Sequence, residues 1–135
     1  MAKVRAVLTQ TVNAFKEMPD SVSDLGRLKD RLQDIRRANV EHHLRLIAAA
    51  SAAGASIICL GELFTSPYFA LSKDPLWLDL AEDVERGPSV GALRKAAAER
   101  KVVVVALLYE LDDATGKRFN TAVVIEADGR ILGKY

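Results

Sequence analysis

The sequence has a single cysteine, Cys59, so it offers no internal disulfide. It also lacks a charge excess, because 19 basic and 18 acidic residues leave a formal net charge of +1. This balance disfavours a nucleic-acid binder and a polybasic membrane anchor. No apolar run approaches the ~20 residues that cross a bilayer. These absences predict a cytoplasmic protein without nucleic-acid or membrane partners, which acts on a small molecule or on another protein.

Motifs for nucleotides and metals are missing as well. No P-loop or Gly-x-Gly-x-x-Gly pattern follows a strand-like segment. His42 and His43 are adjacent on a predicted helix, so their side chains point in different directions, and no third ligand is near in the sequence. These patterns disfavour a bound nucleotide and a metal site at the two histidines.

The first half of the sequence predicts a strand, a long helix and a second strand. Short alternation of apolar residues at 4–8 indicates a strand. From Leu25 the apolar residues recur mostly at helical spacing, and Gly54 is placed to end one long helix. The apolar run at 56–60 is typical of a strand covered on both faces. A strand, a helix and a strand in this order predict a parallel pair.

The second half repeats this order and then changes character. A short helix is predicted at 75–81, a longer helix from Val90, and a fully apolar strand at 102–108. The last segment differs, because Asp128 and Gly129 lie between two strand-like segments and indicate an antiparallel hairpin. The 135 residues thus predict a single α/β domain whose few helices cover one face of the sheet. We expect this domain to be incomplete, since Tyr135 follows directly on the last strand.

The carboxyl ends of the strands are where an open α/β sheet binds its ligand, and Glu62 comes two residues after the apolar run that ends at Leu60. A carboxylate walled there by Leu63, Phe64, Tyr68 and Phe69 would lose solvent, which suits a general base near neutral pH. The residues alone leave open a solvated or helix-capping glutamate instead.

The segment 59–69 resembles the first catalytic block of the nitrilase superfamily of carbon-nitrogen hydrolases. Further similarity lies, in the same order as in the family, at 7–10, 80–88, 107–110, 119–125 and 128–135. The similarity is greatest to the N-carbamoylputrescine amidase and β-ureidopropionase branch, which has a similar Glu-Leu-Phe followed by Pro-Tyr-Phe. Many relatives have proline where this chain has Gly61, so we expect the same placement of Glu62 with less rigidity.

The resemblance implies a Glu-Lys-Cys triad whose glutamate is Glu62. The other two members are expected beyond Tyr135, so that the chain alone would be inactive. Lys134 lies one motif position before the family's lysine. Cys59 precedes the glutamate inside a predicted buried strand, where cysteines are typically inert. The implied fold is the N-terminal half of an α-β-β-α sandwich, in a protein that forms homo-oligomers.

The implied reaction is hydrolysis of a small amide or N-carbamoyl amine, with release of ammonia and without a cofactor. Phe64 and Tyr68 are candidates for the substrate pocket, although aromatic residues in such a loop are also common in a core. Glu110 is a candidate supporting residue or an ordinary loop carboxylate, and Asn120 is expected to make structural hydrogen bonds. The alternative function is a non-catalytic interaction module that associates through an exposed apolar sheet face.

Overall fold

The computed structural model describes residues 3–70, 72 and 74–135, and in this part of the chain five strands form one mixed sheet. The strands follow one another across the sheet in chain order: β1 (Ala6–Leu8), β2 (Ile57–Cys59), β3 (Val103–Asp112), β4 (Lys117–Ile125) and β5 (Ile131–Lys134). The pairs β1–β2 and β2–β3 are parallel, whereas β3–β4 and β4–β5 are antiparallel. The predicted α/β class is confirmed.

The long helix expected from Leu25 is in fact two elements. A 3₁₀ helix, η1 (Val22–Arg31), comes first, and the α-helix α1 (Leu32–Ala52) follows it. Leu25 and Leu28 are both buried and stand three residues apart, a spacing that fits one turn of a 3₁₀ helix as well as an α-helix, so the apolar pattern did not distinguish the two. From Leu32 onward the buried residues continue at steps of three and four, and here the backbone is α-helical. Gly54, at φ 82°, ends α1 as expected.

Two further helical elements connect the strands. They are the short 3₁₀ helix η2 (Pro75–Leu80), whose first turn is capped by Asp74 at 2.9 Å from the Leu76 nitrogen, and α2 (Pro88–Arg100). Proline stands at the start of both, where its missing N–H costs no helical hydrogen bond. None of the described helices is long and apolar enough to span a membrane.

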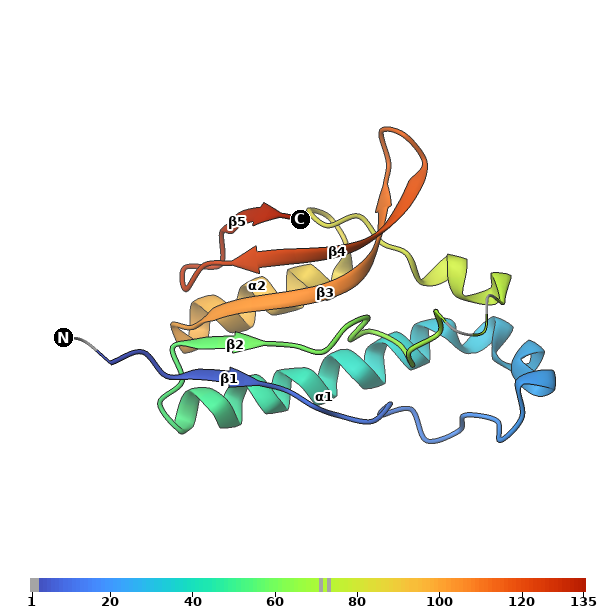
Figure 1. Cartoon of the computed structure of the whole chain (residues 1–135), viewed down its shortest axis with the longest axis horizontal. Coiled ribbons are helices and arrows are strands. Elements are labelled where there is room, and N and C mark those ends of the chain that lie inside the picture. The colour runs from blue at the N-terminus through green and yellow to red at the C-terminus, as the bar shows by residue number, and fades with distance from the viewer. Residues whose placement is uncertain (1–2, 71, 73) are drawn as a thin grey trace.

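Both α1 and α2 lie on one side of the sheet (Figure 1). Along β3 the alternation is clear, because Val104, Ala106 and Leu108 are fully buried under these helices while the residues between them are only partly buried. The expectation that the apolar strands are covered on both faces is therefore wrong for the described residues, and the prediction that the helices cover one face is confirmed. One helix layer on one sheet is half of an α-β-β-α arrangement.

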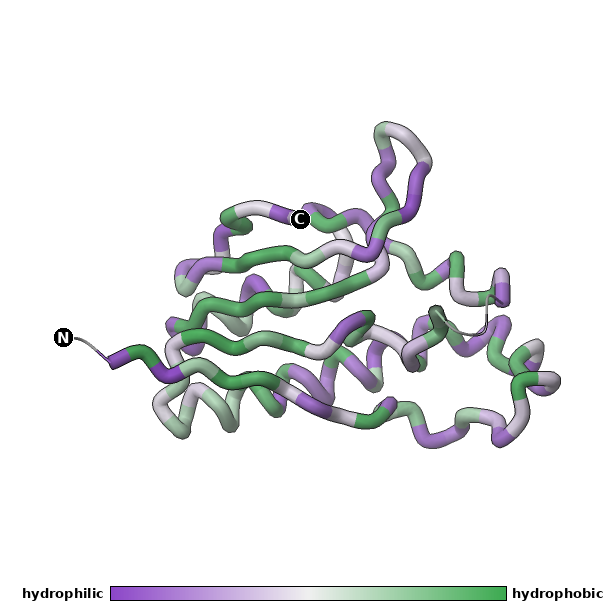
Figure 2. Tube along the Cα trace, viewed as in Figure 1, coloured by the Kyte–Doolittle hydropathy of each residue, from purple (hydrophilic) through white to green (hydrophobic). Residues whose placement is uncertain are grey.

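The sheet surface opposite α1 and α2 is called the open face here. The strand pairing places the following residues on it: Ile57, Cys59, Val103, Val105, Leu107, Tyr109, Asn120, Ala122 and Val124. All but Asn120 are apolar or aromatic, and Figure 2 shows the hydrophobic colour running along β2, β3 and β4. Cys59 is only partly buried on this face, which corrects its predicted position inside a fully covered strand.

The hairpin of β3 and β4 is longer than the apolar segments indicated. Pairing continues to Asp112 opposite Lys117, and the turn projects beyond the sheet (Figure 1). Within this turn the Thr115 hydroxyl donates to Asp112 at 2.7 Å, and Gly116 takes φ 68°. Charged residues occupy this extension, so hydrophobic periodicity did not reveal it.

Candidate active site

The chain leaves the sheet for two residues directly after β2. The Leu60 nitrogen donates to the Val105 carbonyl at 2.8 Å, and the next bond to β3 is from the Phe64 nitrogen to the Leu107 carbonyl at 3.1 Å. In a regular parallel ladder the donor to Leu107 would be Glu62, because donors and acceptors both advance by two residues. Two extra residues therefore loop out, and Glu62 lies in this loop.

Leu63 turns the chain back toward the core. Its φ of 53° lies in the left-handed region, which is uncommon for a bulky residue other than glycine. The turn is held by Ser66, whose backbone nitrogen and hydroxyl donate to the Leu63 carbonyl at 3.0 and 3.2 Å. Leu63 and Phe64 are each 3% exposed, whereas Glu62 before them is exposed. The backbone thus separates one outward carboxylate from two inward apolar side chains.

The Glu62 carboxylate reaches across β3 to β4, where Nδ2 of Asn120 donates a hydrogen bond to its Oε1. Asn120 is paired with Tyr109 and lies on the open face. The expected apolar wall around Glu62 is absent, because Leu63 and Phe64 are buried in the core and Tyr68 is 54% exposed. The Glu62 carboxylate is therefore exposed rather than enclosed by apolar side chains.

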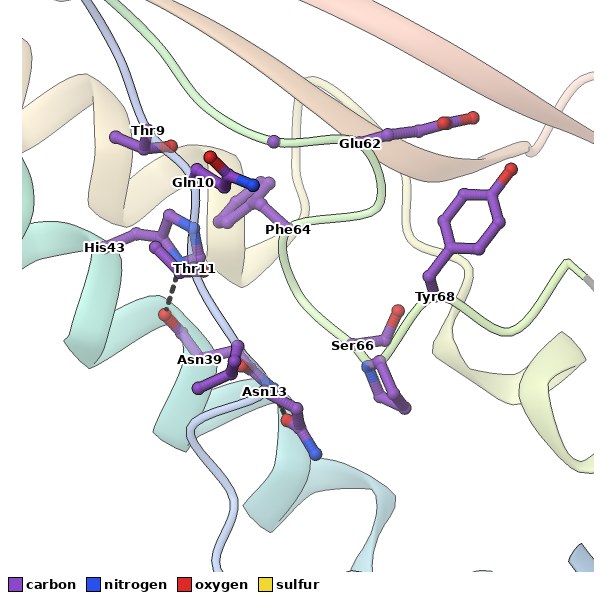
Figure 3. A pocket seen from close by; sticks show the side chains of 13 residues that line it. Thr9, Gln10, Thr11, Asn13, Asn39, His43, Glu62, Phe64, Ser66 and Tyr68 are labelled. Carbon is purple, nitrogen blue, oxygen red and sulfur yellow. Dashed lines mark hydrogen bonds between the residues drawn. The ribbon is translucent and has the colours of Figure 1, made fainter.

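A hollow of about 280 Å³ lies beside this loop. Glu62, Phe64 and Tyr68 all line it. In Figure 3 the Glu62 side chain extends toward the Tyr68 side, whereas the Phe64 ring lies on the opposite side beside His43. The remaining lining of the hollow comes from the segment after β1, from α1 and from the same loop: Thr9, Gln10, Thr11, Val12, Asn13, Asn39, His43, Gly61, Ser66 and Pro67. Most of these polar side chains are uncharged, so Glu62 supplies the negative charge of the hollow.

His43 also lines this hollow, although from the sequence it was weighed only as a metal ligand. It is 3% exposed, its Nδ1 lies 2.8 Å from the Asn39 carbonyl, and its ring meets the Phe64 ring edge-on at 5.3 Å. Burial lowers the pKa of His43 below its ordinary value, which keeps the imidazole neutral near pH 7. The available signal was its four-residue spacing from Asn39 and Ile47, which puts all three on one helix face.

Asn39 fixes the segment after β1 to α1. Its Oδ1 accepts from the Ala14 nitrogen at 2.9 Å, and its Nδ2 donates to Asn13 at 2.7 Å and to the Ile35 carbonyl at 2.9 Å. A buried amide with all of its hydrogen-bonding atoms engaged holds two chain segments together. These hydrogen bonds therefore hold the segment after β1, which lines the hollow, against α1.

Glu110, the predicted supporting residue, lies on the helix-covered side of the sheet and outside this hollow. It is 3% exposed, its Oε2 accepts from the Thr121 hydroxyl at 2.6 Å, and its Oε1 accepts from Lys134. The hydrogen bond to Glu110 raises the pKa of Lys134. The structure thus brings Glu62, Phe64 and Tyr68 together and leaves Glu110 and Lys134 as a separate pair.

No group of three histidine, cysteine, aspartate or glutamate side chains suited to hold a metal ion occurs among residues 3–70, 72 and 74–135. His42 and His43 are neighbours on α1, and the Nδ1 of His43 is already engaged with the backbone. The chemistry that these residues offer is that of a carboxylate beside neutral polar and aromatic groups.

Comparison with known proteins gives the site a context. The family model described as carbon-nitrogen hydrolase matches residues 35–135. The β-ureidopropionase of Arabidopsis thaliana is 36% identical over 91 residues, which are 67% of this chain and 22% of that protein. The N-carbamoylputrescine amidase of Oryza sativa subsp. japonica is 31% identical over 102 residues, 76% of this chain and 33% of that protein.

A solved structure that is similar to this chain is also described as a carbon-nitrogen hydrolase. The crystal structure of a carbon-nitrogen hydrolase from Helicobacter pylori G27 matches with a TM-score of 0.65 and 31% identity, over 74% of this chain and 34% of that one. The chain spans a third or less of the length of both curated relatives named above. The matched residues include Glu62 and the whole sheet except β1. By this family match, the chain belongs to the carbon-nitrogen hydrolase family.

Proposed function

We propose that Glu62 is the general base of a site that hydrolyses an amide or a ureide, in a longer protein of which this chain is the N-terminal part. The observation that carries the proposal is the looped-out Glu62 carboxylate, displayed at the carboxyl end of β2 and held by Asn120. In such folds ligands bind at the carboxyl ends of the strands, and this is the edge of the sheet where Glu62 lies.

The family resemblance supplies the other two groups, a lysine and a cysteine that would follow Tyr135. Glu62 takes the proton of the cysteine, the thiolate attacks the carbonyl carbon, and the lysine stabilises the oxyanion. Glu62 then gives its proton to the departing ammonia and activates the water that releases the acyl or carbamoyl group. On this proposal the residues up to Tyr135 are inactive by themselves.

The proposed substrate is a small linear amide or N-carbamoyl amine. Two observations support this class: the names of the relatives, and a hollow of about 280 Å³ lined by Glu62 and mostly uncharged polar and aromatic side chains. Phe64 and Tyr68 would then contact the substrate beside Glu62. Association into homo-oligomers is part of the same proposal.

The test is an assay of a protein extended beyond Tyr135 on N-carbamoylputrescine and on β-ureidopropionate. Glu62→Gln keeps the shape of the side chain but removes the base, so we expect a loss of roughly 10²- to 10⁴-fold in kcat. Glu99→Gln is the matched control, because Glu99 is an exposed residue on α2 far along the chain from the loop. Full activity of Glu62→Gln would contradict the proposal.

A second candidate is a non-catalytic interaction module, and the open face favours it. An apolar sheet surface without a cover in the described residues is a surface that associates. Val105 and Val124 face each other across β3 and β4 at its centre. If the 135 residues act alone, light scattering should show a complex that Val124→Lys dissociates. A natural stop codon after Tyr135 would favour this candidate, and a lysine and a cysteine in frame would exclude it.

A further inference from the structure

We infer that Asn120 is the positioning residue of Glu62: its amide fixes which carboxylate oxygen is available for proton transfer. The inference rests on the proposed function of Glu62 and adds a residue to it. Nδ2 of Asn120 donates to Oε1 of Glu62, across 58 positions in the sequence. Among the described residues Oε2 has no hydrogen-bond partner, so Oε2 is the oxygen left to take and return the proton.

Asn120 is well placed to act as a fixed point. It lies within β4 and pairs with Tyr109 in a ladder that runs from Val104 to Asp112. The next residue, Thr121, is 3% exposed and donates to Glu110 on the opposite side of the sheet. Because one side of β4 is anchored there, the strand does not turn about its axis, and the Asn120 amide stays on the open face.

Glu62, in contrast, is weakly held by its own backbone. It lies in the two-residue insertion between the hydrogen bonds of Leu60 and Phe64 to β3, and it follows Gly61. Its side chain has three rotatable bonds, and its exposed position provides no packing that would select one orientation. The bond from Asn120 is the contact that selects it.

The polarity of this contact also matters. The amide nitrogen is a donor only and a carboxylate oxygen is an acceptor, so the contact fits an ionised carboxylate, which is the form a base needs. The reverse orientation of the amide would bring Oδ1 against a carboxylate oxygen, two acceptors without a proton between them. The bond also leaves the other carboxylate oxygen free, so positioning does not block the reaction.

The experiment uses the extended protein and the two probes N-carbamoylputrescine and β-ureidopropionate. We expect Asn120→Ala to lower kcat by roughly 10- to 100-fold, the effect of a misplaced catalytic group, with little change in KM. In Asn120→Asp a second carboxylate faces Glu62, so the acidic limb of the pH–rate profile should move to higher pH. Asn120→His, which restores a ring N–H donor, should recover part of kcat.

Lys117→Ala is the matched control, since Lys117 is exposed on the same strand and its side chain makes no hydrogen bond within the described part of the chain. Wild-type kcat and an unmoved pH profile in both Asn120→Ala and Asn120→Asp would overturn the inference. An equal loss in all three Asn120 variants, with an unmoved profile and a lowered Tm, would also overturn it in favour of a purely structural role.

The outcomes separate this inference from the proposed function. If Glu62→Gln is inactive while Asn120→Ala is fully active, only the role of Asn120 fails. If Glu62→Gln is fully active, the proposed function fails. If Asn120→Ala does not fold, the nearly isosteric Asn120→Asp carries the test through its pH–rate profile.

Discussion

The Thr121 hydroxyl donates a 2.6 Å hydrogen bond to Oε2 of Glu110, a carboxylate that is only 3% exposed. The two residues lie on adjacent strands, on the side of the sheet that α2 covers. A buried acceptor without its donor retains its full desolvation cost, which makes this contact more valuable than a surface hydrogen bond.

Thr121→Val removes that donor at nearly constant volume. We expect the free energy of unfolding to fall by about 1 to 3 kcal/mol, because Oε2 of Glu110 then has no partner from β4. Urea unfolding measures the change. Thr115→Val is the matched control, since Thr115 donates at 2.7 Å to Asp112 in the exposed hairpin turn, where water replaces the lost bond. Equal losses in the two variants would contradict the argument.

Stability should depend on pH through His43. Burial lowers the pKa of this imidazole from its ordinary 6.5, so between the folded-state pKa and 6.5 the unfolded chain binds more protons than the folded one. The free energy of unfolding is therefore greatest above pH 6.5 and falls as the pH drops through that window. His43→Leu should flatten this slope, whereas His42→Leu should keep it, as thermal unfolding from pH 7.5 to 5 would show. A slope unchanged in His43→Leu would exclude His43 as its source.

Gly87 should tolerate no side chain. A Cβ there would lie 2.4 Å from the Asp83 carbonyl and 2.6 Å from a carboxylate oxygen of Glu82, which itself accepts from the Ser89 nitrogen at 3.0 Å. We expect Gly87→Ala to lower the free energy of unfolding by roughly 1 to 3 kcal/mol. Gly91→Ala, within α2 and with nothing near its Cβ, should instead raise it by about 0.5 to 1 kcal/mol. The measurement is the Tm of each variant relative to the wild type, which should fall for Gly87→Ala and rise for Gly91→Ala.

Gly61 should accept alanine, although it precedes the candidate base. The atom nearest to a Cβ at this position is the Thr9 carbonyl at 4.0 Å, and its φ lies outside the left-handed region. We expect Gly61→Ala to gain about 0.4 to 1 kcal/mol, mainly because the unfolded chain loses freedom. Calorimetry measures the gain, and activity of the extended protein should be kept. A loss of stability would mean that the loop needs glycine.

The strands and their pairing were predictable because the apolar runs are short and bounded by turn residues. The sequence misled where polarity or spacing was ambiguous. Leu25 and Leu28 fit a helix of either kind, and the charged end of the β3–β4 hairpin carries no apolar alternation. Only the three-dimensional contacts decide between such readings.

The candidate site was predictable in position but not in exposure. Glu62 follows a strand end, which predicts its place at the carboxyl edge of the sheet, whereas its catalytic role was implied only by the family resemblance. Its exposure depends on the left-handed turn at Leu63 and on two residues that leave the ladder, and neither has a signature in a single sequence. Its partner Asn120 comes from a strand 58 positions away, which no local pattern can indicate.

The order of the strands has a consequence for how the molecule folds. β3, β4 and β5 are joined by tight turns, so their pairing closes only short loops, whereas β1 must wait for residues 9–56 to fold back before it meets β2. We expect amide protons of the β3–β4–β5 meander to become protected first in pulsed hydrogen exchange. Glu62 would then arrive with β2, which pairs with β3, when the neighbouring β4 already holds Asn120 in place.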